Sequence, residues 1–196
     1  MRQERSFFVE NITFVIYNFL NSSMEKRILN KTHKLTSMAL LFALAMVFSI
    51  IESIIMPMFA LPPGVKLGLS NIVVMYCMVY LGFPSAIELA LLKGLFAFLT
   101  RGATAGLLAT MGGVLSAVVM FILRKLFGEK INYYTLSVFG ALSHNLGQLI
   151  GTTFIFSSGY VMYYFPVLMI SAVIMGLVTG AVLTVVIPAL ERIRRG

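Results

Sequence analysis

Six long apolar segments, each close to the length needed to cross a bilayer, are the feature that most constrains this chain. A spanning helix takes about 20 mostly apolar residues. Short polar, glycine or proline breaks separate the segments, and no stretch keeps the alternating pattern of a membrane strand. The segments cover residues 35–56, 65–81, 84–100, 103–123 and 134–156, with a sixth that follows an aromatic stretch at 160–164 and ends near 190. The sequence therefore predicts an all-α polytopic membrane protein, a six-helix transmembrane bundle.

The positions of lysine and arginine predict how this bundle is oriented. With six spans, the larger basic groups all fall on one side of the bilayer, and the other side has only Lys66 and Arg101. The larger groups are Lys31 and Lys34 before the first segment, Arg124, Lys125 and Lys130 after the fourth, and Arg192, Arg194 and Arg195 after the sixth. Because loops rich in lysine and arginine stay inside, we expect both termini in the cytoplasm and the chain in the cell membrane.

The composition excludes several functions. Hydrophobic residues make up 59% of the chain and charged residues 11%, whereas a soluble domain is about one quarter charged. All seven acidic residues are glutamate, so this chain alone lacks the aspartates that bind Mg²⁺ and diphosphate in prenyltransferases. The single cysteine, Cys77, allows neither an internal disulfide nor a multi-cysteine zinc site. We therefore expect no enzymatic activity, no cofactor and no metal.

The net charge of +8 has no nucleic-acid motif beside it, so we assign it to loops at the membrane surface and expect a lipid partner rather than nucleic acid. Residues 1–33 form a leader whose apolar part is too short to span and lacks a signal-peptide cleavage site. Translation from Met24 and an interfacial or disordered extension both remain open. Residues 34–192 form the membrane domain, and 193–196 form a basic tail.

A few ionisable side chains lie within or beside the apolar segments, where each costs roughly 2.5–3.5 kcal/mol at a helix centre. Glu88 and Lys93 share one segment but are five residues apart, about 140° around a helix, so they do not pair cleanly. Glu52 lies near the outer end of the first segment. Lys66 and Arg101 lie at outer boundaries, where snorkelling can explain them. We regard Glu52, Glu88, Lys93 and Arg101 as possible ligand or relay residues.

The fifth segment carries the densest polar pattern. Its members fall within an arc of about 100° and so form one polar face, which must look inward; they are His144, Asn145, Gln148 and Thr152. One interpretation is hydrogen bonding between helices. The other is a ligand cavity that opens outward, lined by this face and closed by the 57–68 connection with Lys66. Lysine and histidine would favour an anionic solute.

Small residues also recur at four-residue spacing, which lets helices approach closely. The pairs are Ala39 and Ala43, Gly102 and Gly106, Gly147 and Gly151, and Gly176 and Gly180. Most of these pairs are expected to pack the bundle. Ala39 and Ala43 are the pair that we consider for docking a partner helix.

Two strings connect the chain to a known family. PGVKLGLSN at 63–71 and SHNLGQ at 143–148 resemble the heptaprenyl diphosphate synthase component I family, also called the Gx transporter family. The resemblance covers roughly residues 34–192. That family is similar in size and layout to the substrate-binding S components of energy-coupling factor (ECF) transporters, which have six helices, cytoplasmic termini and an outward-facing ligand site capped by the connection between the first two helices.

The resemblance implies uptake of a small metabolite or vitamin-like solute, with a transmembrane coupling subunit and an ATPase pair as partners, and the lysine and histidine noted above favour an anionic one. S components dock the coupling subunit through an Ala-x-x-x-Ala face, which Ala39 and Ala43 match. The chain has no Walker A motif, so ATP hydrolysis would come from the partners. The expected substrate-binding residues are Lys66, Asn71, His144, Asn145, Gln148 and Thr152.

Two alternatives stay open. The family label implies a non-catalytic membrane accessory subunit of a heptaprenyl diphosphate synthase in isoprenoid-quinone synthesis. A self-sufficient carrier would need coupling-ion residues, for which Glu88 and His144 are the candidates. We favour the S-component interpretation because the chain contains no aspartate.

Overall fold

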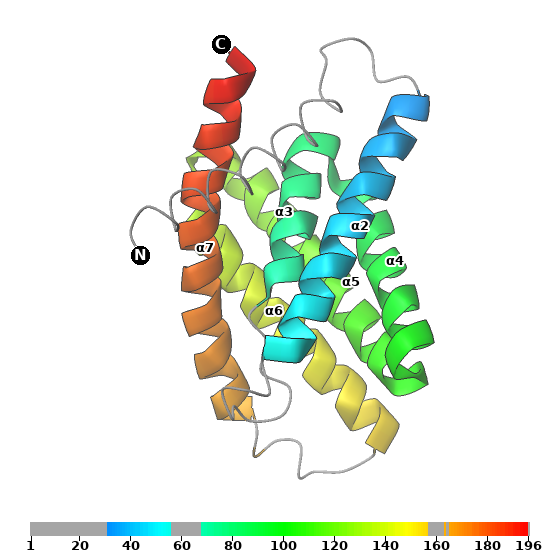
Figure 1. Ribbon diagram of the computed structural model, residues 1–196. Coiled ribbons are helices and arrows are strands. Elements are labelled where there is room, and N and C mark those ends of the chain that lie inside the picture. The colour runs from blue at the N-terminus through cyan, green and yellow to red at the C-terminus, as the bar shows by residue number, and fades with distance from the viewer. Residues whose placement is uncertain (1–30, 56–67, 157–162, 164, 196) are drawn as a thin grey trace, which may run out of the picture.

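In the computed structural model the described residues form six α-helices that pack side by side, and consecutive helices run in alternating directions (Figure 1). The structure describes residues 31–55, 68–156, 163 and 165–195. The helices are α2 (Lys31–Ile55), α3 (Leu69–Leu81), α4 (Phe83–Arg101), α5 (Ala103–Phe127), α6 (Tyr133–Phe156) and α7 (Phe165–Arg195), with a short 3₁₀ turn η2 (Gly128–Lys130) before α6. The described residues contain no strand, which confirms the predicted all-α class.

Four of these helices are long and apolar enough to cross a membrane. They are α4, α5, the Lys34–Ile55 part of α2 and the Phe165–Thr184 part of α7. Helix α6 has 24 residues, but its polar face interrupts the apolar run. Helix α3 has 13 residues, about 20 Å of rise against roughly 30 Å of hydrocarbon. The predicted start of the second segment, near residue 65, lies outside the described residues. In the described part, α3 begins at Leu69, directly after Gly68 in a left-handed conformation.

The short α3 is the central helix. It packs against α2, α4, α5, α6 and α7, and in Figure 1 it lies between α2 and α7. Around it, α4 contacts α2 and α5, and α6 contacts α5 and α7. Residues 73–78 of α3 are all buried, so six consecutive side chains point into the bundle on every side. A helix that is apolar all round is one that its neighbours enclose.

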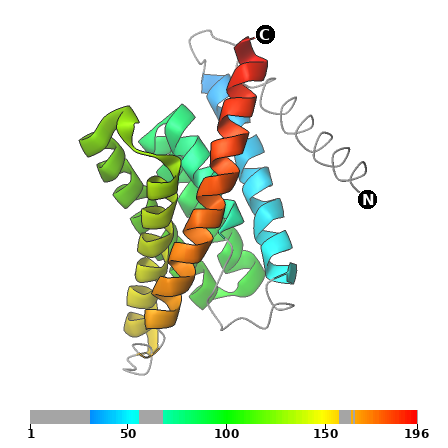
Figure 2. The same cartoon turned by 90° about the vertical axis from the view of Figure 1, so that its left-hand side faces the viewer.

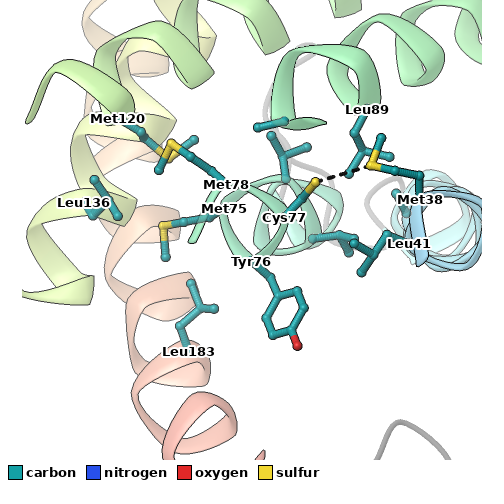
Figure 3. Packing of buried hydrophobic residues seen from close by; sticks show 14 of the residues in the cluster. Met38, Leu41, Met75, Tyr76, Cys77, Met78, Leu89, Met120, Leu136 and Leu183 are labelled. Carbon is teal, nitrogen blue, oxygen red and sulfur yellow. Dashed lines mark hydrogen bonds between the residues drawn. The ribbon is translucent and has the colours of Figure 1, made fainter. Parts of the chain in front are cut away.

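Sulfur-containing side chains fill much of the core around α3. Figure 3 shows Met78 pointing toward Met120 and Met75 extending toward the side of Leu136 and Leu183, while Cys77 points toward Met38 on α2. The Sγ of Cys77 lies 3.7 Å from the Sδ of Met38, and both residues are buried. Methionine fills irregular spaces between helices that cross at different angles, because its unbranched chain is flexible. Cys77 is thus a core residue, and it is a free cysteine.

Glycines bring the outer helices close together. A Cβ on Gly147 would lie 2.8 Å from the Met111 oxygen of α5, and one on Gly176 would lie 2.6 Å from the Val138 Cα of α6. The pairs on α6 and α7 are therefore packing contacts, as predicted. The Gly102 and Gly106 pair is not one surface: Gly102, with φ +91°, is the break between α4 and α5, and a Cβ on it would meet nothing within 4 Å.

The start of α2, the end of α5, the start of α6 and the end of α7 gather at one end of the bundle (Figures 1 and 2). This end contains Lys34 and the last turn of α5 with Arg124 and Lys125. The predicted loop from Arg124 is wrong, because α5 continues to Phe127, where cations at a helix C-terminus complement its dipole. Arg101 lies at the end of α4, at the opposite end of the bundle.

Candidate functional site

A polar cluster surrounds the first turn of α3. Gly68 precedes the helix with φ +75°, and its backbone N–H donates a 2.5 Å hydrogen bond to Oε1 of Glu52 near the end of α2. Glu52 is only 5% exposed. The Gly68 carbonyl in turn accepts a 2.9 Å bond from the N–H of Asn71 in the first turn of α3. A buried carboxylate is thus bound at the N-terminus of a helix that begins inside the bundle.

The third partner comes from α4. The Lys93 ammonium donates a 3.0 Å hydrogen bond to Oδ1 of Asn71, and Lys93 is partly buried. On the α7 side, Oγ1 of Thr179 lies 3.9 Å from the position that a Cβ on Gly68 would take. We call Glu52, Gly68, Asn71, Lys93 and Thr179 the α3 polar cluster. It brings residues of α2, α4 and α7 to the start of α3.

This arrangement is suited to holding an anion. The first N–H groups of a helix have no partner within the helix, and the helix dipole makes its N-terminus partly positive. The Lys93 ammonium adds a full positive charge beside the same turn. A carboxylate, Glu52, already accepts a hydrogen bond there. A carboxylate or phosphate group fits the same chemistry.

The polar face of α6 points inward, as predicted. His144 is buried and Asn145, Gln148 and Thr152 are partly buried, whereas Phe139, Leu146 and Ile150 on the opposite side are exposed. The edges of this face contact the neighbouring helices. A Cβ on Gly112 of α5 would lie 3.0 Å from Cε1 of His144, and Nδ2 of Asn145 donates a 2.9 Å hydrogen bond to the Leu168 carbonyl of α7.

The side chains of the α6 face therefore have different roles. Asn145 ties α6 to α7, which matches the interhelical interpretation. Thr152 donates to the Gln148 carbonyl of its own helix, at 2.8 Å. The side-chain amide of Gln148 makes no hydrogen bond with any residue that the structure describes. Gln148 is thus the member of this face whose donors and acceptors are available to a solute.

The remaining predicted residues lie apart from these groups. Glu88 is exposed on α4, five residues before the inward-facing Lys93, so the two do not pair. Nη2 of Arg101 lies 3.3 Å from Oγ of Ser49 at an exposed position. Ala39 and Ala43 are exposed on α2. Lys66 and the predicted capping connection lie outside the described residues. Thr179 was not predicted from the sequence. It is a single threonine in an apolar helix, and no periodic polar pattern in the sequence distinguishes it.

In the described part of the chain, no group of three or more histidine, cysteine or acidic side chains is positioned to bind a metal ion. A family model described as heptaprenyl diphosphate synthase component I matches residues 41–186, about three quarters of the chain. The match includes the whole α3 polar cluster and the α6 polar face. No curated protein and no solved structure matches the chain.

Proposed function

Because the chain belongs to the heptaprenyl diphosphate synthase component I family, we propose that it is a membrane subunit that binds a small anionic solute within its helical bundle. In this proposal it is the S component of an ECF-type transporter, and separate subunits supply the ATPase. The observation that carries the proposal is the α3 polar cluster, where a helix N-terminus, a lysine and an amide converge inside a bundle of apolar helices.

The charge of Lys93 supports this proposal. A lysine in the middle of an apolar helix is costly in a membrane, and such residues mark solute or ion pathways. The Lys93 ammonium lies at the first turn of α3, 3.0 Å from Oδ1 of Asn71, where a positive charge attracts a negatively charged group. This favours an anionic solute over a neutral or cationic one.

The α6 face supports a solute with further polar groups. Gln148 faces inward, and its amide has both donors and acceptors to spare. The buried His144 lies one turn before Gln148 on the same face. We propose that the anionic group binds at the α3 polar cluster and that a second polar part of the solute reaches Gln148.

The outer face of α2 supports the partner assignment. Ala39 and Ala43 are exposed, and the exposed Val47 and Ile50 continue the same side of the helix. Two exposed alanines one turn apart leave a shallow surface against which another helix can pack closely. We propose this face as the docking site for the transmembrane coupling subunit.

The basic end of the bundle supports six crossings with both termini in the cytoplasm. Lys34, Arg124, Lys125 and the end of α7 lie together there, as the positive-inside rule requires of a cytoplasmic end in the cell membrane. Reporter fusions at each terminus and at Gly102 test this: the two termini should report cytoplasmic and Gly102 external. Any other pattern contradicts the six-span topology.

The transport role is tested by purification and uptake together. Affinity-purified chain should bring down a coupling subunit and an ATPase pair, and Ala39→Leu with Ala43→Leu should abolish this and uptake while leaving solute binding intact. Ala181→Leu, at an exposed alanine of α7, is the matched control and should leave both unchanged. Copurification and uptake that survive the double substitution would contradict the S-component role.

The family description favours a second candidate, a non-catalytic membrane accessory subunit of a heptaprenyl diphosphate synthase. The missing aspartates leave no catalytic role with Mg²⁺-bound diphosphate for this chain alone. Adding the chain in lipid nanodiscs to the catalytic prenyltransferase should then change its rate or product length. An unchanged rate and length would eliminate this candidate.

A further inference from the structure

We infer that Glu52 is an internal competitor for the anion site proposed above. Its carboxylate takes the position at the start of α3 that the anionic group of the solute occupies after binding, so the solute must displace it. This inference rests on the proposed function. It goes further in that the Glu52 carboxylate would control both the affinity of the anion site and the attachment of α2 to the start of α3.

The first step is that the carboxylate at this position comes from a distant part of the chain. Gly68, the residue before α3, has no side chain, and the helix has no side-chain cap of its own. Glu52 supplies the acceptor at this helix start instead. It lies sixteen residues earlier, on a different helix, and its Oε1 accepts the Gly68 N–H. A displaceable anion thus occupies a position that helices usually fill with a neighbouring residue.

The second step concerns charge. A neutral amide oxygen can also accept a backbone N–H, so a purely structural cap does not require a charge. A buried carboxylate, 5% exposed among apolar helices, is expensive. The positive end of α3 and the Lys93 ammonium reduce this cost, and the same two groups would attract the anionic group of the solute. Glu52 therefore meets the electrostatic conditions proposed for the solute.

The third step links the site to helix attachment. The Glu52–Gly68 hydrogen bond joins the end of α2 to the start of the central helix, and α2 also makes a polar contact with α4 through Ser49 and Arg101 at an exposed position. Displacing the carboxylate breaks the hydrogen bond to Gly68. Solute binding thus loosens the outer end of the helix whose exposed face carries Ala39 and Ala43.

The test is Glu52→Gln in the full-length protein in detergent, titrated by calorimetry with succinate, inorganic phosphate and inorganic diphosphate. The glutamine oxygen can keep the Gly68 bond, but the competing charge is gone. At least one probe should bind about tenfold tighter, or more, to Glu52→Gln than to wild type. In wild type the negative charges of the probe and of the Glu52 carboxylate repel each other, and this repulsion is strong in a partly buried site. Glu88→Gln, at an exposed glutamate of α4, should change nothing.

Glu52→Asp is a second variant, in case the glutamine variant folds poorly. It keeps the charge but shortens the reach to Gly68, so its affinity should lie between wild type and Glu52→Gln. Equal or weaker binding in both folded variants overturns the inference and leaves the proposed anion site standing. Probe binding by neither wild type nor the variants overturns both. Binding by Glu52→Gln alone supports the inference most strongly.

Discussion

The Lys93 ammonium of α4 lies 3.0 Å from the Oδ1 of Asn71 in the first turn of α3. This contact brings a cation to the N-terminus of the central helix, opposite the Glu52 carboxylate that accepts the Gly68 N–H. Both charged residues lie in apolar helices and both meet the same turn. The start of α3 therefore brings together the buried Glu52 and the partly buried Lys93.

Lys93→Gln should weaken anion binding by about tenfold or more, because it removes the cation while retaining a donor for Asn71. Calorimetric titration of the folded variant measures this change. Arg101→Gln, at the exposed end of the same helix, is the control and should bind like wild type. Unaltered affinity in Lys93→Gln would remove this residue from the site.

Asn145→Leu and Gln148→Leu should separate structure from binding on the α6 face. Asn145 donates to the Leu168 carbonyl, so its loss should cost about 0.6–2 kcal/mol of stability. Gln148 makes no such bond, so Gln148→Leu should change stability little and weaken solute binding. Thermal unfolding and titration on both variants provide the comparison. Equal stability losses would assign the whole face to packing.

Gly147→Ala should destabilise the α5–α6 contact by about 1–3 kcal/mol, since the new Cβ would lie 2.8 Å from a backbone oxygen and 2.9 Å from the Gly112 Cα. Gly113→Ala is the graded control. Its Cβ would meet the Ala90 Cβ at 3.3 Å, so the loss should be smaller. Thermal melts in one detergent compare them, and a greater loss in Gly113→Ala would contradict the packing described for α5 and α6.

Ser37→Ala and Ser116→Ala form another matched pair. Both serines are buried, but Oγ of Ser37 has no hydrogen-bond partner among the described residues, whereas Oγ of Ser116 donates a 2.9 Å bond to the Gly140 carbonyl. Removing the first hydroxyl should be neutral or stabilising, and removing the second should cost about 1 kcal/mol. Denaturation midpoints measured side by side would contradict this packing if Ser37→Ala were the more damaging change.

The features predicted correctly from the sequence are those that depend on the length of the apolar segments and on helical periodicity. The sequence predicted the all-α class and the inward-facing polar side of α6, and the described residues form six α-helices. It did not predict where α3 begins, because the left-handed conformation of Gly68 depends on the surrounding fold. Nor did it show that Glu52, Asn71 and Lys93 meet, since residues on three helices are brought together only when α3 occupies the centre.

Charge position was harder to predict than apolar position. Glu88 and Lys93 lie on the same helix and have similar apolar neighbours in sequence, yet Glu88 is exposed and Lys93 points inward. Five residues of helix rotation separate them, and only the placement of α3 decides which side is the inside. Lys93 was therefore one of several candidates until the central helix was known.

The most direct test of the central claim is native mass spectrometry of the gently purified protein, comparing wild type with Lys93→Gln. Wild type should retain a small anionic molecule, and Lys93→Gln, although folded, should lose it. Wild-type protein without any bound small molecule, or a molecule retained equally by Lys93→Gln, would contradict an anion-binding site at the start of α3.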